Sequence, residues 1–371
     1  MWQYIMMYFV SCILAYISER KLNVNNYKEF YFFSFLSIFV GAFLAGVRSL
    51  GVGTDTLVYG HGVFINAINR NFLDYFTDEL SNFEPLYLLF TYIISNIFKN
   101  ENVYYGIYEF IIILLIYSSL FETKKIINNK SESNICWLGL FVFYTLIYPF
   151  TLNGMRQSMA MAIIFYSFKY LYKSDLKKFI ICNVIAIGFH YTAVIGILFY
   201  VMEYLLKKTN KIIAKILILF IMVISVFEYK YLISFINIFV DKYERYIGGS
   251  VDFILNPFLI RIPFLLLLII FRKNYKSIFC EIDFWIMMLI GEILFCQLRS
   301  SIPALYRTSL YFSLIKIQAY PNIDKIFKRK DRVMIKIFLI LFLLAIWYYQ
   351  IVVKGNEQIY PYRSNIINWL N

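Results

Sequence analysis

The amino-acid sequence predicts an all-α protein that crosses a membrane many times. Of its 371 residues, 61% are hydrophobic and only 16% are charged, whereas soluble domains contain about 45–50% apolar and about 25% charged residues. The apolar residues form long continuous runs, unlike the alternating ten-residue segments of a β-barrel. At roughly 20 residues per helix, the chain has room for about 10–12 spans. We therefore expect one polytopic membrane domain over residues 1–371.

The runs that carry almost no charge define the expected spans. In order, they are residues 1–18, 30–47, 103–121, 135–151, 158–172, 212–227, 257–271, 282–298, 305–320 and 333–353. Residues 85–98 are also apolar but short, and we expect a helix that lies at or dips into the outer face. Residues 179–206 must begin and end on one side, which predicts two short crossings or a re-entrant hairpin with His190 near its tip.

The charged loops set the expected orientation. Lys and Arg gather in short loops, which usually face the cytoplasm, and this explains the net charge of +13 without a nucleic-acid partner. With those loops inside, both termini lie outside, together with the loop 48–84, the turn at Arg156 and the tail 354–371. The N-terminus lacks a basic region and a small-residue cleavage site, so we expect its first run to remain as a span.

Motifs for metals and cofactors are lacking in the sequence. The five cysteines show no CxxC pair, and four of them lie inside apolar runs, where cysteine behaves as a small apolar residue. No P-loop or dinucleotide-binding glycine pattern occurs. We therefore expect no metal and no cofactor.

The first candidate site lies in the outer loop that starts at Arg48. Its glycines allow a tight turn and a close approach to a ligand, while Thr54, Asp55 and Thr56 offer hydroxyl and carboxylate groups. One interpretation is a sugar- or phosphate-binding loop with Asp55 as a base. The other is that Thr54 or Asp55 caps a surface helix that runs through Tyr59.

The second candidate is the turn before residue 158, which holds Arg156 and Gln157. An Arg at a helix start opposes the helix dipole, yet its planar fork suits phosphate or carboxylate oxygens. The alternative is an Arg that snorkels to the lipid headgroups.

Glu84 and His190 are the next candidates. Glu84 precedes a proline that would begin a helix, and a favourable first-turn acid explains much of this pattern. A histidine in the middle of a membrane segment is costly and is a functional candidate by default. A structural histidine with satisfied hydrogen bonds is the alternative for His190.

Further polar residues complete the set. Arg307 begins an expected span on the outer side, and Tyr360 and Arg363 belong to an aromatic and basic group in the tail. Each of these residues is either a ligand contact or an interfacial anchor. Glu109 and Glu292 lie inside expected spans and are either paired or proton-handling. Most of these candidates reach the outer face, where a cavity with several guanidinium groups would suit a diphosphate.

The order of these motifs along nearly the whole chain resembles the EpsG family of Wzy-like polymerases. The matching motifs are Arg48 with Gly53-Thr54-Asp55-Thr56 and Tyr59, Glu84-Pro85, Asn153-Gly154-Met155-Arg156-Gln157-Ser158, Phe189-His190-Tyr191-Thr192-Ala193, Arg307 with Tyr311-Phe312, and Tyr360-Pro361-Tyr362.

The resemblance implies a bacterial cytoplasmic-membrane glycosyltransferase, grouped with GT-C-like enzymes, with an outward-facing cavity. Such an enzyme joins oligosaccharide repeat units carried on undecaprenyl diphosphate during exopolysaccharide or capsule biosynthesis. The lipid diphosphate is the leaving group, so neither a cofactor nor a nucleotide sugar is needed. The expected partners are lipid-linked oligosaccharides and the bilayer, with a chain-length regulator protein as a further candidate.

The implied chemistry assigns roles to the candidates. Positioned cations stabilise the leaving diphosphate, for which Arg156 and Arg307 come first and Arg48 third. A base activates the acceptor hydroxyl, for which Asp55 precedes His190. The remaining substrate-binding candidates are Thr54, Thr56, Glu84, Gln157, Tyr360 and Arg363.

Two other classes of function stay open. One is a different transferase on a lipid-linked glycan, such as a ligase, or an O-acyltransferase that would use His190. The other is a transporter or flippase, which usually shows internal repeats and broken helices around a central pathway. No internal repeat stands out in this sequence.

Overall fold

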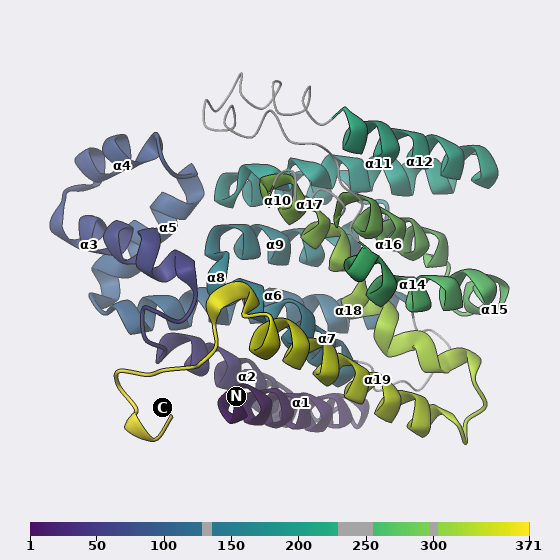
Figure 1. Ribbon diagram of the computed structural model, residues 1–371, viewed down its shortest axis with the longest axis horizontal. Coiled ribbons are helices and arrows are strands. Elements are labelled where there is room, and N and C mark those ends of the chain that lie inside the picture. The colour runs from purple at the N-terminus through teal and green to yellow at the C-terminus, as the bar shows by residue number, and fades with distance from the viewer. Residues whose placement is uncertain (128–135, 229–254, 297–302, 371) are drawn as a thin grey trace. The chain divides into compact units, whose positions relative to one another are not determined.

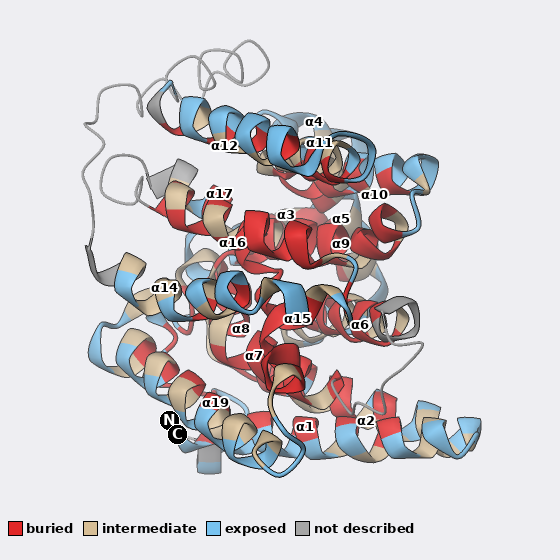
Figure 2. Ribbon diagram, turned by 90° about the vertical axis from the view of Figure 1, so that its right-hand side faces the viewer, coloured by how far each residue is buried: buried red, intermediate tan, exposed pale blue. Residues whose placement is uncertain are grey.

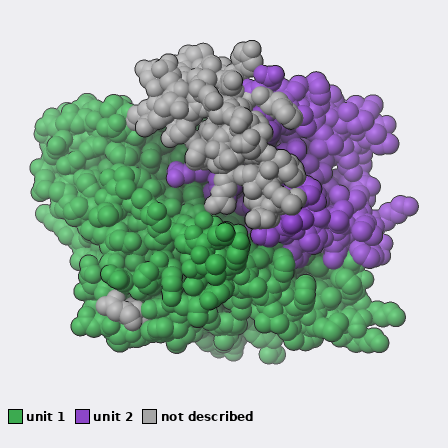
Figure 3. All heavy atoms as spheres, viewed as in Figure 1, with its two compact units in different colours: residues 1–193, 320–371 green, residues 194–319 purple. Residues whose placement is uncertain are grey.

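The structure is a computed structural model that describes residues 1–127, 136–228, 255–296 and 303–370. Within these residues every regular element is a helix, as expected (Figure 1). The chain divides into two compact units, residues 1–193 with 320–371, and residues 194–319 (Figure 3). A single domain over residues 1–371 stays a prediction.

The first unit contains the N-terminal helices and the C-terminal segment. Its helices are α1 (Trp2–Asn23), α2 (Tyr27–Gly46), η1 (Thr56–Gly60), α3 (His61–Asn69), α4 (Phe72–Leu80), α5 (Pro85–Phe98), α6 (Glu101–Ile127), α7 (Cys136–Leu146), α8 (Tyr148–Asn153), α9 (Met155–Tyr172), α10 (Leu176–Phe189), η5 (Tyr320–Ile326), α19 (Arg332–Trp347), η6 (Tyr348–Val353), η7 (Asn356–Gln358) and η8 (Asn368–Leu370).

The second unit is smaller. Its helices are α11 (Gly196–Lys208), α12 (Lys211–Phe227), α14 (Leu255–Ile270), α15 (Arg272–Lys276), α16 (Ile282–Cys296), α17 (Pro303–Ser313) and α18 (Lys316–Ala319). The short helix η2 (Tyr191–Ile195) spans the boundary between the units.

Helix length and burial fit a membrane protein. Three segments of the described chain are long and apolar enough to cross a bilayer, namely Tyr27–Gly46, Glu101–Thr123 and Arg332–Val353. Shorter apolar helices include Pro85–Phe98 and Cys136–Leu146. Large apolar residues are exposed on several helices, whereas nearly all residues of α9 are buried (Figure 2). Apolar surface outside a polar-containing interior is the arrangement that lipid tails favour.

Three of the apolar runs are interrupted in the structure. The run 179–206 breaks as expected, because α10 ends at Phe189 and His190 has extended backbone angles. The run 135–151 was expected to be continuous but splits at Ile147, because the new helix α8 begins there with Pro149 as its second residue and proline is favoured in a first turn. The run 305–320 also ends early, at Ser313, before the short helix α18.

The Gly-Thr-Asp-Thr loop is packed against the end of α8. Gly53 has a φ of +89°, and a Cβ built there would lie 2.2 Å from the carbonyl oxygen of Leu152. Glycine is therefore required at this position for two reasons, namely the positive backbone angle and the close approach of the Leu152 carbonyl. The Thr54 amide donates to Asn153 Oδ1 at 2.8 Å, which fixes the loop on the turn between α8 and α9.

The C-terminal segment also holds this loop. We call residues 356–364 the strap. Its backbone carbonyls at Gln358 and Arg363 accept hydrogen bonds from the amides of Gly53 and Ser49, at 3.0 and 2.8 Å. The Tyr362 hydroxyl donates to the carbonyl of Leu44 at 2.8 Å. The strap therefore joins the end of α2 and the loop that follows it (Figure 1).

The two ends of the described chain also meet. The rings of Trp2 and Trp369 stack with centroids 5.9 Å apart, and the Tyr4 hydroxyl donates to the carbonyl of Ile359 at 2.8 Å. The beginning of α1 and the strap consequently lie at the same end of the first unit.

We predict that Gly53→Ala destabilises the first unit. The added methyl group must avoid a backbone oxygen and adopt a positive φ, which together should lower the free energy of unfolding by about 2 kcal/mol. Gly51→Ala is the matched control, because no atom lies within 4 Å of its Cβ position. Thermal unfolding of both purified variants in detergent measures the difference. Equal stability of the two variants would contradict the close approach.

Candidate functional site

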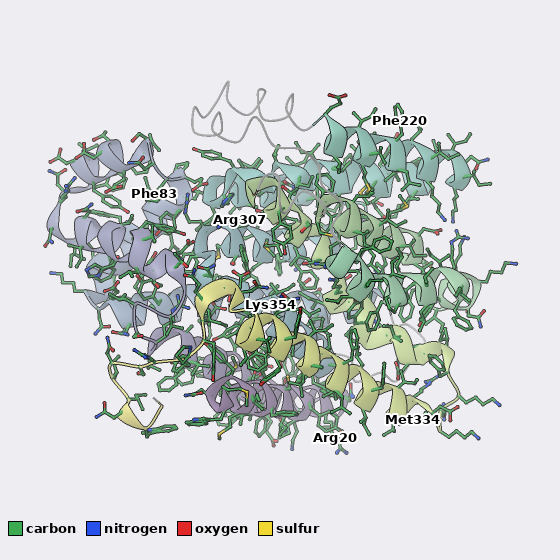
Figure 4. All side chains as sticks on the ribbon, in the orientation of Figure 1. Arg20, Phe83, Phe220, Arg307, Met334 and Lys354 are labelled. Carbon is green, nitrogen blue, oxygen red and sulfur yellow. The ribbon has the colours of Figure 1, made fainter. Side chains whose placement is uncertain are left out.

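The site is built around Arg156, the second residue of α9. Its guanidinium carbon lies 4.8 Å from the ring centre of Tyr59, 5.0 Å from that of Phe83 and 5.9 Å from that of Tyr87. Phe83 is labelled in Figure 4. A cation over aromatic faces is stabilised by the ring quadrupoles. Arg156 is therefore enclosed in the protein by an aromatic cage, which the snorkelling interpretation does not require.

Glu84 supplies the counter-charge. The Arg156 Nη1 donates to Glu84 Oε2 at 2.5 Å, and the two side chains are only 21% and 3% exposed. Pro85 does begin α5, but the Glu84 side chain makes no capping hydrogen bond there. Its carboxylate serves the ion pair with Arg156 instead of acting as a simple first-turn acid.

Asp55 joins this group through Tyr59. The Tyr59 hydroxyl donates to the Asp55 carboxylate one helical turn away, and the same ring covers Arg156. Burial, followed by the charge of Asp55, raises the pKa of Tyr59 well above its ordinary value, so the phenol stays a donor. A helix does start here and runs through Tyr59, but Asp55 makes no side-chain cap. We call Asp55, Tyr59, Glu84 and Arg156 the acid–arginine cluster.

The cluster has two carboxylates and one guanidinium. The exposed part of Arg156 and the half-buried Asp55 are the groups that a substrate could reach. The Arg156 Nε is buried and has no hydrogen-bond partner in the described protein. Glu84 therefore orients Arg156 while one of its donors remains unused.

Arg48 occupies a different place in the same unit. Its side chain is only 4% exposed and lies 5.4 Å from the Tyr105 ring centre. Its Nε and Nη1 are buried without a hydrogen-bond partner among the described residues. Such unsatisfied charged donors are costly.

His190 directly follows the end of α10. Its Nδ1 lies 3.2 Å from the Thr192 amide nitrogen and 2.9 Å from the Thr192 hydroxyl oxygen. Since the backbone N–H can only donate, we assign Nδ1 as the acceptor and place the proton of a neutral ring on Nε2. In this tautomer the basic lone pair of His190 is already engaged. The neighbouring Tyr191 lies within electrostatic range of Glu84 and Arg156.

The two glutamates that were expected inside spans are paired rather than isolated. Glu109 accepts a hydrogen bond from the Thr151 hydroxyl at 2.7 Å. Glu292 contacts both Arg261 Nε and Lys316 Nζ at 2.5 Å in the second unit. Neither of these two cations was predicted as a partner of Glu292, although both are charged residues within apolar runs.

The threonines of the loop make internal hydrogen bonds. The Thr54 hydroxyl bonds to Gln358 Oε1 at 2.5 Å, and the buried Thr56 hydroxyl lies 2.8 Å from the carbonyls of Leu50 and Gly53. These contacts hold the loop in shape. Gln157 is also buried, next to Arg156 on α9.

The remaining predicted residues belong to the strap or to the second unit. Tyr360 is 40% exposed and Arg363 is exposed, and both belong to the strap. Arg307 is an exposed residue of α17 in the second unit. The structure thus brings together Asp55, Glu84 and Arg156 but does not show the other candidates beside them.

Sequence reasoning missed the aromatic cage. Phe83 and Tyr87 are contributed by the segment around Glu84, and Tyr59 by the Asp55 helix. The available signal was the spacing of Asp55 and Tyr59, because residues four apart share one face of a helix. Among the described residues, no group of three or more His, Cys, Asp or Glu side chains could hold a metal ion.

The helical fold with exposed apolar surfaces and a buried acid–arginine cluster defines a membrane protein with a polar site. The family comparison then identifies the class: the chain belongs to the EpsG family, whose model matches residues 30–364. This is a family of Wzy-like polymerases, so the protein is linked to exopolysaccharide polymerisation in a membrane. No match was found among curated proteins or among solved structures.

We predict strong energetic coupling between Glu84 and Arg156. In a double-mutant cycle with Glu84→Gln and Arg156→Gln, each single change leaves a mostly buried charge unpaired, so the coupling energy should reach about 1.5–3 kcal/mol. Arg70 and Asp78 form an exposed pair at 2.9 Å and provide the control, with an expected coupling below about 1 kcal/mol. The readout is thermal or denaturant unfolding in detergent. Similar coupling energies for both pairs would refute a special role for the buried pair.

Proposed function

We propose that the protein is a polysaccharide polymerase that joins oligosaccharide repeat units carried on undecaprenyl diphosphate at the outer face of the bacterial cytoplasmic membrane. The reaction would serve exopolysaccharide or capsule biosynthesis. Family membership supports the general class of activity. The acid–arginine cluster is the single observation that supports this chemistry, because it combines an oriented guanidinium with an accessible carboxylate.

The proposed reaction exchanges one bond at the anomeric carbon for another. An acceptor hydroxyl oxygen attacks C1 of the donor glycan, and the C1–O bond to the lipid diphosphate breaks. The diphosphate leaves with the bonding electron pair, while the acceptor proton passes to a base. The reaction needs no nucleotide and no redox partner, since the leaving diphosphate provides the driving force.

Arg156 is the first residue that we assign to the leaving diphosphate. Glu84 fixes one edge of the guanidinium and the aromatic cage fixes its plane, so little reorganisation is needed when negative charge develops. One guanidinium beside two carboxylates does not neutralise a diphosphate. A second cation must therefore contribute, and we keep Arg307 as its first candidate and the buried Arg48 as the next.

Asp55 is the residue that we assign as the base. It is half-buried, and its carboxylate is held by the Tyr59 hydroxyl. His190 is the weaker candidate because the Thr192 amide occupies its Nδ1. In our proposal Thr54, Thr56 and Gln157 shape the binding loop, while Tyr360 and Arg363 on the strap contact the glycan.

We expect Arg156→Lys to abolish the polymer ladder. Lysine keeps the positive charge but loses the fork that Glu84 orients, so the rate should fall by about 10²–10³-fold. The measurement is the chain-length profile of surface and lipid-linked glycan after the variant is returned to a strain that lacks the gene. Arg70→Lys, an exposed change of the same kind, should restore the wild-type ladder.

A normal ladder in the strain without the gene would exclude the polymerase and favour another transferase or a transporter. Single repeat units without a ladder, restored by the wild type, would support polymerisation. If Arg156→Lys reaches wild-type levels in the membrane and gives full-length polymer, its assignment to the diphosphate is wrong.

The choice of base is tested by Asp55→Asn and His190→Gln in the same assay. Loss of a general base typically lowers a rate by about 10²–10⁴-fold, and we expect that loss for Asp55→Asn. His190→Gln should retain a visible ladder, and the exposed change Asp78→Asn should have no effect. The reverse result, with polymer from Asp55→Asn and none from His190→Gln, would exchange the two roles.

A further inference from the structure

A second charged cluster lies in the second unit, where α12, α15 and α16 meet. Asp283, near the start of α16, is only 6% exposed and sits at its centre. Arg272 contacts both carboxylate oxygens, at 2.5 and 2.7 Å, and Lys215 Nζ lies 2.8 Å from Oδ1. Lys276 Nζ lies 4.0 Å from Oδ2. With Lys211, these residues form what we call the basic cluster.

The basic cluster has more positive charge than its acid can balance. Asp283 already accepts from Arg272 and Lys215, so its single negative charge does not also balance Lys211 and Lys276. Contact with Lys211 is the largest cause that lowers the pKa of Lys276, ahead of burial. Glu203 and Glu281, nearby acids of the same unit, act on Lys207 instead. An anion held between the ammonium groups would relieve this repulsion.

The cluster differs from an ordinary Lys-rich loop. Lys328 and Lys330 follow each other closely in the sequence, and both are exposed. The basic cluster draws its cations from two helices and gathers them around one buried carboxylate. Its side chains remain accessible, with Lys215, Arg272 and Lys276 between 26% and 39% exposed. A charged ligand can therefore reach them.

An apolar surface begins directly beside the basic cluster. On α12, Ile212, Ile216 and Phe220 are 70%, 61% and 61% exposed, and Phe220 is labelled in Figure 4. On α14, which leads into Arg272, Leu266 and Ile270 are 49% and 70% exposed. Both helices pack against α16. The unit thus presents cations and, next to them, helices with uncovered aliphatic side chains.

We propose that the basic cluster binds the phosphate headgroup of an anionic phospholipid whose acyl chains lie along α12 and α14. Cations clustered at the end of membrane helices favour acidic lipid headgroups. The neighbouring apolar surface distinguishes this ligand from a free phosphate, which would use the cations alone. Lys-rich ends of membrane proteins usually face the cytoplasm, so the lipid belongs to the cytoplasmic leaflet. This binding site is independent of the proposed polymerase chemistry.

The test measures lipid binding to the purified full-length protein in detergent. Phosphatidylglycerol is titrated onto the wild type and onto Lys211→Gln/Lys276→Gln, and bound lipid is counted by native mass spectrometry. Each cation contributes about 1 kcal/mol, so the double variant should bind about 30-fold more weakly. Lys328→Gln/Lys330→Gln removes the same charge from an exposed loop and should bind within about twofold of the wild type.

Thermal unfolding gives a second readout that separates lipid binding from misfolding. Removal of two mutually repelling ammonium groups should leave the unfolding temperature without lipid equal to or above that of the wild type. Phosphatidylglycerol should raise the unfolding temperature of the wild type and of the Lys328→Gln/Lys330→Gln control, but not that of Lys211→Gln/Lys276→Gln.

Three results would overturn the proposal. They are equal binding of phosphatidylglycerol and neutral phosphatidylcholine, equal protection by inorganic phosphate, and equal loss of binding in the Lys328→Gln/Lys330→Gln control. None of these measurements needs glycan synthesis. A failure here therefore leaves the polymerase proposal unaffected, and a failure of the polymerase proposal leaves the lipid site unaffected.

Discussion

The ion pair between Glu84 and Arg156 is the interaction on which the candidate site depends. Burying a guanidinium requires a counter-charge and polarisable surroundings, because the loss of water around an unpaired ion costs several kcal/mol. Here the start of α5 supplies Glu84, and the residues around it supply Phe83 and Tyr87. The pair consequently ties the start of α5 to the start of α9.

Tyr59 connects this ion pair to the motif that contains Asp55. Its ring covers Arg156 and its hydroxyl reaches Asp55, so one residue connects a cation–π contact to a carboxylate. The position of Asp55 is therefore set by packing around the guanidinium. The loop before Asp55 is also fixed by Asn153, only three residues before Arg156. Three segments that are distant in the sequence therefore contact one another and hold the site residues in place.

Composition and motif order predicted much of this protein. Long apolar runs are sufficient to indicate a helical membrane protein, and the motifs containing Asp55, Glu84 and Arg156 do meet in space. Their partners were not predictable, because a carboxylate can cap its own helix or reach another side chain with little difference in local energy. In the structure, both Asp55 and Glu84 contact another side chain instead of capping a helix. Only the tertiary structure decides between these two alternatives. The sequence also indicated that Gly53 allows a tight turn. It did not reveal the nearby carbonyl oxygen of Leu152, which leaves no room for a side chain at this position.

The strap has a consequence for how the chain folds. Thr54 and Gln358 hydrogen-bond across 304 positions of sequence, so the loop cannot reach its final shape until almost all of the described chain has been synthesised. Contacts of such long range form late and slowly. During membrane insertion, the early helices must remain associated without the strap. The acid–arginine cluster lies within the first 156 residues of the chain, whereas the loop beside it reaches its final shape only when synthesis is nearly complete.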